Sequence, residues 1–214
     1  MADFDPGTGL GPRLRLVRGS RQLSVRELAR RVGCSASLIS QIERGVSVPS
    51  VGVLYSLATE LGSSLDYLLF GSGAGPAVAP EPREAPDAVP RVPGSVPPPA
   101  IVQRGCDRRI IDLASGVRWE RLTPQSEAMT DFLEVIYSPG GHSTDERRPL
   151  RHDGREYGLI ISGTLQANVG FESYELGPGD SIAFDSSTPH EYLNKTGGYV
   201  HAIWVVVHSE PGRA

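Results

Sequence analysis

The chain has 214 residues, with 21 Lys and Arg side chains against 25 Asp and Glu and a formal net charge of −4 at pH 7. A hydrophobic fraction of 39% is enough for a core and excludes a wholly disordered chain. No apolar run approaches the ~18 residues of a membrane span, and residues 1–12 lack the apolar region of a secretion signal. Two distant cysteines, Cys34 and Cys106, fit a reducing compartment, so we expect a cytoplasmic protein with no membrane partner.

Positive charge is concentrated near the N-terminus. Between Leu10 and Gly45 there are eight arginines and only two glutamates, whereas residues 71–214 carry 13 basic and 19 acidic side chains. A locally basic segment on an acidic chain is typical of contact with a polyanion. Nucleic acid is therefore the first candidate partner.

Composition divides the chain into three zones. Residues 10–70 have helical periodicity, and residues 71–100 contain nine of the 18 prolines and few large apolar side chains. Residues 101–214 contain short β-branched and aromatic runs separated by turn residues, which is typical of antiparallel strands. We therefore predict a two-domain α + β fold: a helical domain at 10–70, a semi-extended linker at 71–100 and a β-domain at 101–214.

Capping signals predict five helices in the first zone. Ser24 and Ser35 are N-cap residues, with Glu27 completing a capping box, while Gly33 and Gly45 end the helices that follow. The first helix is expected at about 10–20, the fourth begins after Pro49-Ser50, and the last covers 65–70. Two short helices joined by a glycine turn, the second beginning with small polar residues, predict a helix-turn-helix motif at 24–43.

From residue 24 to residue 50 the sequence reads SVRELARRVGCSASLISQIERGVSVPS, which closely resembles the Cro/cI-type (XRE) helix-turn-helix family. The resemblance implies a five-helix domain that places its third helix in the major groove of double-stranded DNA. The residues that it assigns to base edges and phosphates are Ser35, Ala36, Ser37, Ser40, Gln41, Arg21 and Arg44.

These residues have different implied roles. Gln41 suits adenine because its amide can bond bidentately, whereas Arg21, Arg44 and the arginines of the first helix would contact phosphates. Val25 departs from the family, which often has a phosphate-binding Gln there, so a modest loss of affinity is expected. The alternative is that the helical domain mediates protein contacts and its arginines only solvate the surface.

Eight strands are predicted in the third zone, separated by turn signals at residues 138–141 and 177–180. The ranges are 109–114, 117–122, 131–138, 157–162, 164–170, 181–185, 190–194 and 199–207. So many short strands suggest a jelly-roll or a related β-barrel.

The β-domain carries the residues of a second family. His152, Glu156 and Gly163 reproduce the second half of the first cupin motif, H-x-H-x3-4-E-x6-G, and His190 and Asn194 reproduce the H-x3-N end of the second. The chain thus resembles XRE-family regulators with a C-terminal cupin sensor domain. It departs from the motifs at three positions: Leu150 replaces the leading His, and Asp185 and Ser187 replace a Pro and a Gly.

Three metal-ligand residue types remain in these motifs. His152 and Glu156 are four residues apart, so on one strand they would share a face, and His190 would come from a neighbouring strand. Two imidazoles and a carboxylate form a facial triad suited to a divalent metal such as Fe, Ni or Zn. The alternative is that the pocket holds only an organic effector, hydrogen-bonded to these residues.

Together these features predict a cytoplasmic transcriptional regulator that is not an enzyme. Its helical domain would read an inverted-repeat operator, and its cupin domain would sense a small-molecule effector and form a homodimer through residues 132–137 and 199–207. The alternative is a mononuclear non-haem iron oxygenase or epoxidase of the cupin type, whose helical domain closes over substrate. Against it stand the intact DNA-reading motif and the Pro/Ala-rich linker, which we expect to decouple the domains.

Overall fold

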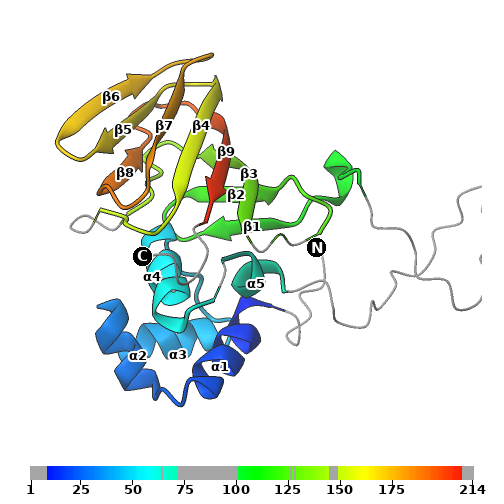
Figure 1. The fold of residues 1–214 in the computed structure, drawn as a ribbon, viewed down its shortest axis with the longest axis vertical. Helices are drawn as coiled ribbons and strands as arrows, with labels where there is room; N and C mark the ends of the chain where they lie inside the picture. Colours follow the sequence, from blue (N-terminus) through cyan, green and yellow to red (C-terminus); the bar gives the residue numbers. More distant parts are fainter. Residues whose placement is uncertain are drawn as a thin grey trace, which may run out of the picture.

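The computed structural model describes residues 9–63, 65–71, 101–125, 127, 129–144 and 149–208. The predicted linker lies outside the described residues except for Gly71. Helices occupy the N-terminal part and strands the C-terminal part, which confirms the two-domain α + β fold class. Figure 1 shows the strands as one body with the helices stacked against it.

The five helices form where the capping signals predict them. They are α1 (Leu10–Ser20), α2 (Val25–Val32), α3 (Ala36–Glu43), α4 (Val51–Leu61) and α5 (Leu65–Phe70). Ser24 Oγ accepts a hydrogen bond from the Glu27 amide, and Gly33, with φ of 77°, allows the sharp turn between α2 and α3. The Glu27 carboxylate differs from the expectation of a capping box, since it accepts hydrogen bonds from Arg30 and Arg31.

The strands form two antiparallel sheets. The six-stranded sheet has the order β1-β2-β3-β9-β4-β7, and the three-stranded sheet has the order β6-β5-β8. The bounds are β1 (Ile110–Leu113), β2 (Val117–Arg121), β3 (Thr130–Tyr137), β4 (Arg155–Ser162), β5 (Leu165–Val169), β6 (Glu172–Leu176), β7 (Ser181–Asp185), β8 (His190–Leu193) and β9 (Val200–Val207). Eight of these strands match the predicted ranges closely. Strand β6 was not predicted, because its first four residues are exposed and lack an apolar alternation.

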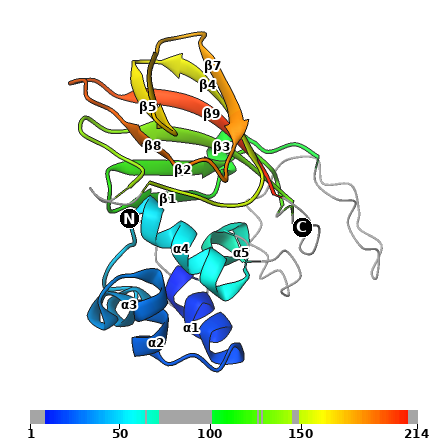
Figure 2. The same cartoon turned by 60° about the vertical axis from the view of Figure 1, so that its left-hand side comes forward.

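Two hydrophobic clusters hold the molecule together. One lies within the helical domain and contains the fully buried Leu14, Leu28 and Leu57. The other joins α4 and α5 to the inner faces of the sheets, and includes Leu54 and Trp119. Figures 1 and 2 agree that α4 and α5 lie against the sheets, whereas α2 and α3 lie on the far side of the helical domain.

This shared cluster corrects the expectation that the domains are decoupled. Tyr55 of α4 is 8% exposed and meets Trp119 of β2 edge-on, with 6.0 Å between ring centroids. The Ala114 amide donates to the Pro49 carbonyl, and the guanidinium of Arg121 lies over the Phe70 ring. The helical domain packs directly on the β-domain through apolar contacts. Among the described residues, no helix is long and apolar enough to cross a bilayer.

Candidate functional sites

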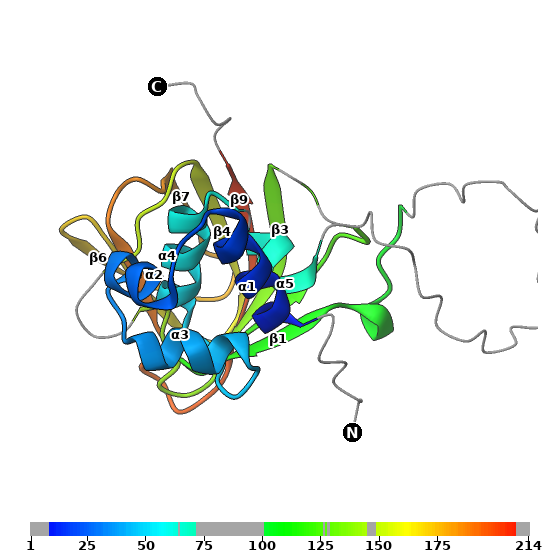
Figure 3. The same ribbon diagram turned by 90° about the horizontal axis from the view of Figure 1, so that it is seen from below.

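The predicted recognition helix presents a polar surface. Buried Ile39 and Ile42 anchor α3 in the helical core. Ser35, Ser37 and Arg44 are exposed, and Ala36, Ser40 and Gln41 are partly exposed. Within α3 the Gln41 amide donates to Ser37 Oγ over 3.4 Å, and Arg44 Nε donates to the Ser40 carbonyl over 3.2 Å. Seen from below, α3 lies on the surface of the helical domain, away from the sheets (Figure 3).

The arginines near α1 have structural partners. Arg18 forms a two-pronged ion pair with Glu43 of α3 at 2.5 and 3.0 Å, and Arg13 donates to the carbonyls of Leu68 and Leu69. Arg21, which the sequence assigns to phosphate, donates to the Leu61 carbonyl at the end of α4. Its side chain is exposed, and DNA contact by Arg21 stays a prediction.

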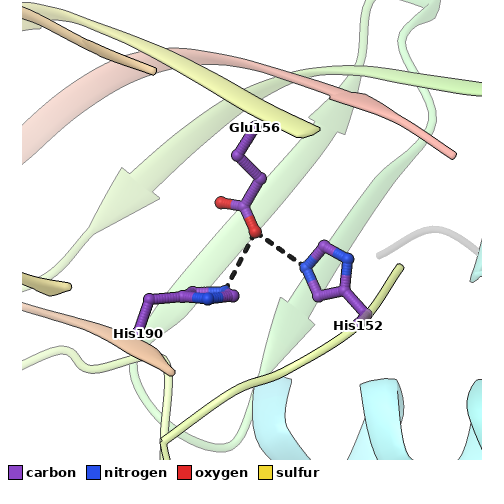
Figure 4. Close-up of side chains that lie close together, drawn as sticks. All are labelled: His152, Glu156 and His190. Atoms are coloured by element: carbon purple, nitrogen blue, oxygen red, sulfur yellow. Dashed lines mark hydrogen bonds and ion pairs between the residues drawn. The ribbon is translucent and has the colours of Figure 1, made fainter. Parts of the chain in front are cut away.

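The three predicted metal-ligand residues converge inside the β-domain. Glu156 Oε1 lies 2.7 Å from His152 Nε2 and 2.9 Å from His190 Nε2, as Figure 4 shows. The expectation that His152 and Glu156 share one strand is wrong, because β4 begins at Arg155 and His152 lies in the preceding loop. His190 begins β8, which belongs to the smaller sheet, so the site spans both sheets.

Hydrogen bonds orient both imidazoles toward Glu156. His190 Nδ1 lies 2.8 Å from the Thr188 carbonyl, and His152 Nδ1 lies 3.3 Å from the Asp153 carbonyl. A carbonyl oxygen only accepts hydrogen bonds, so each Nδ1 can donate to one and leave the Nε2 side of the ring facing Glu156, and His152 Nε2 hydrogen-bonds Glu156 Oε1. His190 Nε2 is buried and, despite its short distance to Glu156, has no hydrogen bond of acceptable geometry to any described residue.

The second oxygen of Glu156 is already bound. Oε2 accepts hydrogen bonds from Tyr192 Oη and Trp204 Nε1, each at 2.7 Å. Burial alone raises the pKa of this carboxyl, but its interactions with His152 and His190 outweigh burial and hold the pKa well below its usual range. Glu156 is therefore a fixed carboxylate with one oxygen, Oε1, directed at the two histidines.

Sequence reasoning missed Tyr192 and Trp204. Tyr192 follows His190 by two residues on β8, so strand alternation puts both on the inner face, and this signal was available. Trp204 lies opposite Gly158, and a Cβ on Gly158 would come within 2.4 Å of the indole ring. The glycine thus gives the indole room beside Glu156, a relation that only the strand register reveals.

Aromatic rings surround the triad, and one comes from the helical domain. The Tyr55 ring stacks on the His152 ring with 4.5 Å between centroids and 13° between planes. Phe184 meets His190 edge-on at 5.0 Å. The cavity beside Glu156 is only about 20 Å³ and is lined by Val51 and Tyr55 of α4 as well as by the barrel.

Two positions of the cupin motifs have structural roles. Leu150, which replaces the leading His, is buried, and its backbone exchanges two hydrogen bonds with His190. The Asn194 amide donates to the carbonyls of Tyr137, Ser138 and Gly198 and so ties the end of β3 to the loop between β8 and β9. The loss of a fourth ligand at position 150 therefore leaves the local backbone arrangement intact.

Comparison with known proteins defines the class. A helix-turn-helix family model matches residues 14–68, and a cupin domain family model matches residues 133–206. The chain therefore carries a helix-turn-helix domain followed by a cupin domain, and it is similar to transcriptional regulators that combine the two.

The particular relatives agree with this class. The chain is 28% identical over 201 residues to the HTH-type transcriptional regulator PuuR of Escherichia coli, covering 93% of this chain and 95% of the relative. A crystal structure of an HTH_3 family transcriptional regulator from Vibrio cholerae has the same fold, with a TM-score of 0.62, 20% identity and coverage of 94% and 96%. Hydroxypropylphosphonic acid epoxidase from S. wedmorenis aligns with a TM-score of 0.43 at 18% identity, covering 94% of this chain and 97% of that one, a similarity too distant to bear on activity.

Proposed function

We propose that the protein is a cytoplasmic, dimeric regulator that reads an inverted repeat in double-stranded DNA through α3. The observation that carries this proposal is the polar surface of α3, where Ser37 is exposed and Gln41 is partly exposed, on a helix that lies on the far side of the helical domain from the sheets. A single recognition helix reads few base pairs, so two copies related by a two-fold axis would read two half-sites about one DNA turn apart.

A binding experiment tests DNA recognition. Gln41→Ala should relax preference at one base pair per half-site by about 1–3 kcal/mol, whereas Arg44→Ala should weaken binding to all sequences equally. The logarithm of affinity should fall steeply with salt, as expected for roughly half a dozen phosphate contacts. Gln166→Ala, a change on β5, is the control and should bind as wild type. Selection of bound sequences from a random pool that shows no preference would refute the proposal.

We propose further that the outer face of the six-stranded sheet is the dimer interface. Strands β3 and β9 pair with each other inside this sheet, so they cannot pair across a two-fold axis, but their outer face can pack. Tyr157 and Leu159 of β4 lie opposite Val205 and Ile203 of β9, forming an apolar surface with Phe132 exposed beside it.

The oligomeric state tests this interface. Leu159→Lys places a charge in the apolar surface and should convert a dimer to a monomer in analytical ultracentrifugation. Leu16→Lys is the matched control, because Leu16 is an exposed leucine on α1 and its replacement should leave the dimer intact. A dimer that survives Leu159→Lys would move the interface elsewhere.

The triad fits a divalent metal ion, and we propose that it binds one. The Nε2 atoms of both imidazoles and a carboxylate oxygen converge, and ligands of an ion at ~2.1 Å lie about 3 Å apart, close to the distances of 2.7 and 2.9 Å. Fe(II), Ni(II) or Zn(II) would replace the protons between these atoms and supply positive charge beside the Glu156 carboxylate. A bound ion would leave coordination positions open for a small-molecule effector.

Thermal unfolding tests the metal site. Adding each of the three ions should raise the melting temperature of the wild type by mass action, while a His152→Ala/His190→Ala double variant should not respond. Glu156→Gln should lower metal affinity sharply, since it removes the anionic ligand at nearly constant volume. No response in the wild type would leave a purely organic effector site. Unfolding of the Glu156→Gln barrel would instead mark Glu156 as a structural residue.

A further inference from the structure

The DNA-binding domain supplies one wall of the cupin site, through Tyr55. The first turns of α4 enter the mouth of the barrel, where Val51 and Tyr55 line the small cavity beside Glu156. Tyr55 stacks on His152 and also meets Trp119, so its ring is held between the two. A residue of the helical domain therefore touches a predicted metal ligand directly.

A larger space lies on the other side of the same side chain. Among the described residues, a crevice of about 790 Å³ runs between the two domains, bounded by Cys34 and Ser56 on the helical side and by His142 and Arg151 on the other. Tyr55 lines both this crevice and the small cavity, as does the buried Leu150. These two side chains therefore lie between the crevice and the small cavity beside Glu156.

Of the two, Tyr55 is better placed to move. Leu150 is fastened by its backbone to His190 through two hydrogen bonds. The Tyr55 ring is held by contacts with two rings, and it can turn about its own side-chain bonds while α4 stays in place. The small cavity holds about 20 Å³, enough for a water molecule or an ion but not for an organic effector. Movement of Tyr55, which stacks on His152 and lines this cavity, would make room for a larger occupant beside Glu156.

We propose that the crevice between the domains is the entrance to the triad and that Tyr55 is its gate. Displacement of Tyr55 opens the triad to ligands and loosens the contact between α4 and the barrel. Since α4 belongs to the helical domain, occupancy of the triad then changes how the DNA-reading helices are held. The inference rests on the proposed function, because it couples the proposed metal site to the proposed DNA-binding surface.

Metal exchange in the full-length protein tests the gate. The two tryptophans, Trp119 and Trp204, contact Tyr55 and Glu156, so their fluorescence reports on the site. In stopped flow with Ni(II) alone, followed by transfer to excess EDTA, Tyr55→Ala should exchange metal about five- to tenfold faster than wild type. Tyr55→Phe keeps the stacked ring and should exchange at the wild-type rate. Val53→Ala, which alters the crevice but not the small cavity, is a second control.

DNA binding supplies the second readout. Ni(II) should change the affinity of the wild type and of Tyr55→Phe for operator DNA, and this change should disappear in Tyr55→Ala. If wild type binds metal and DNA but Tyr55→Ala keeps both the wild-type exchange rate and the wild-type metal effect, the gate is refuted and the proposed function stands. If the wild type binds no metal, the metal site fails first and the gate with it.

Discussion

The two hydrophobic clusters of the helical domain differ in what they join. One cluster, built on Leu14, Leu28 and Leu57, packs α1 to α4 against one another. The other, which includes Leu54 and Tyr55, packs α4 and α5 against the β-domain. Helix α4 contributes to both, so it joins the core of the helix-turn-helix domain to the core of the cupin domain. The boundary between the two hydrophobic cores therefore lies along α4, because one face of this helix packs in each core.

The largest expected effect comes from truncating, on α4, one leucine of each cluster, which tests whether the two clusters are separate. Leu54→Ala and Leu57→Ala remove equally buried side chains, and each should destabilise the protein by about 2–5 kcal/mol in urea unfolding. Amide hydrogen exchange separates them. Leu57→Ala should speed exchange in α1 to α4, whereas Leu54→Ala should also speed it in β2, β3 and β9. Identical exchange patterns would mean that the two clusters unfold as one.

The buried ion pair of Arg18 and Glu43 sharpens the account of the helical cluster. Arg18→Met leaves a carboxylate that is only 8% exposed without its partner, and should cost about 2 kcal/mol or more. The double variant Arg18→Met/Glu43→Gln removes the stranded charge and should recover most of the loss. Denaturant titration measures both. A double variant as unstable as the single one would show that packing by Arg18, not charge, matters.

The N-cap of α2 gives a smaller effect confined to the helix-turn-helix. Ser24→Ala removes the acceptor for the Glu27 amide and should lower stability by about 1 kcal/mol. Ser24→Gly should cost only a few tenths of this, because glycine leaves the amide open to water. Differential scanning calorimetry measures the melting temperatures of the wild type, Ser24→Ala and Ser24→Gly. Equal melting temperatures for wild type and Ser24→Ala would argue against the cap.

The smallest effect is expected where β3 begins and β9 ends, because His208 there hydrogen-bonds Asp131 at 2.7 Å. This bond raises the pKa of His208, partly opposed by burial. A raised folded-state pKa contributes stability that is complete below the unfolded pKa of about 6.5 and is lost as pH rises through the folded-state value. The difference in stability between wild type and Asp131→Asn should therefore shrink as pH rises. A difference that grows with pH would contradict this sign.

Local sequence signals account for the helices and most strands. Ser24, Ser35 and Gly33 act on backbone groups within three or four residues, so their effect is the same whatever surrounds them. Strand β6 escaped prediction because an exposed edge strand needs no apolar alternation. Pairing with β5, not composition, makes it a strand.

The sequence predicted the three candidate ligand residues of the site but not the side chains that contact them. His152, Glu156 and His190 were identified from motif spacing, although the assumed placement of His152 on a strand was wrong. Their second contacts come from residues far along the chain: Trp204 is 48 residues from Glu156, and Tyr55 lies in another domain. No periodicity spans such separations.

By itself the sequence determined the helix bounds, the helix-turn-helix motif and the identity of the three converging residues, because each follows from local backbone chemistry or fixed spacing. The contacts of the three converging residues depend on the tertiary structure. Strand register placed Trp204 over Gly158 and beside Glu156, and domain packing brought Tyr55 onto His152. The apolar side chains of α4 could be buried against helices alone or against the sheets as well. That choice depends on the complementary surface of the folded β-domain, which the helical sequence does not contain.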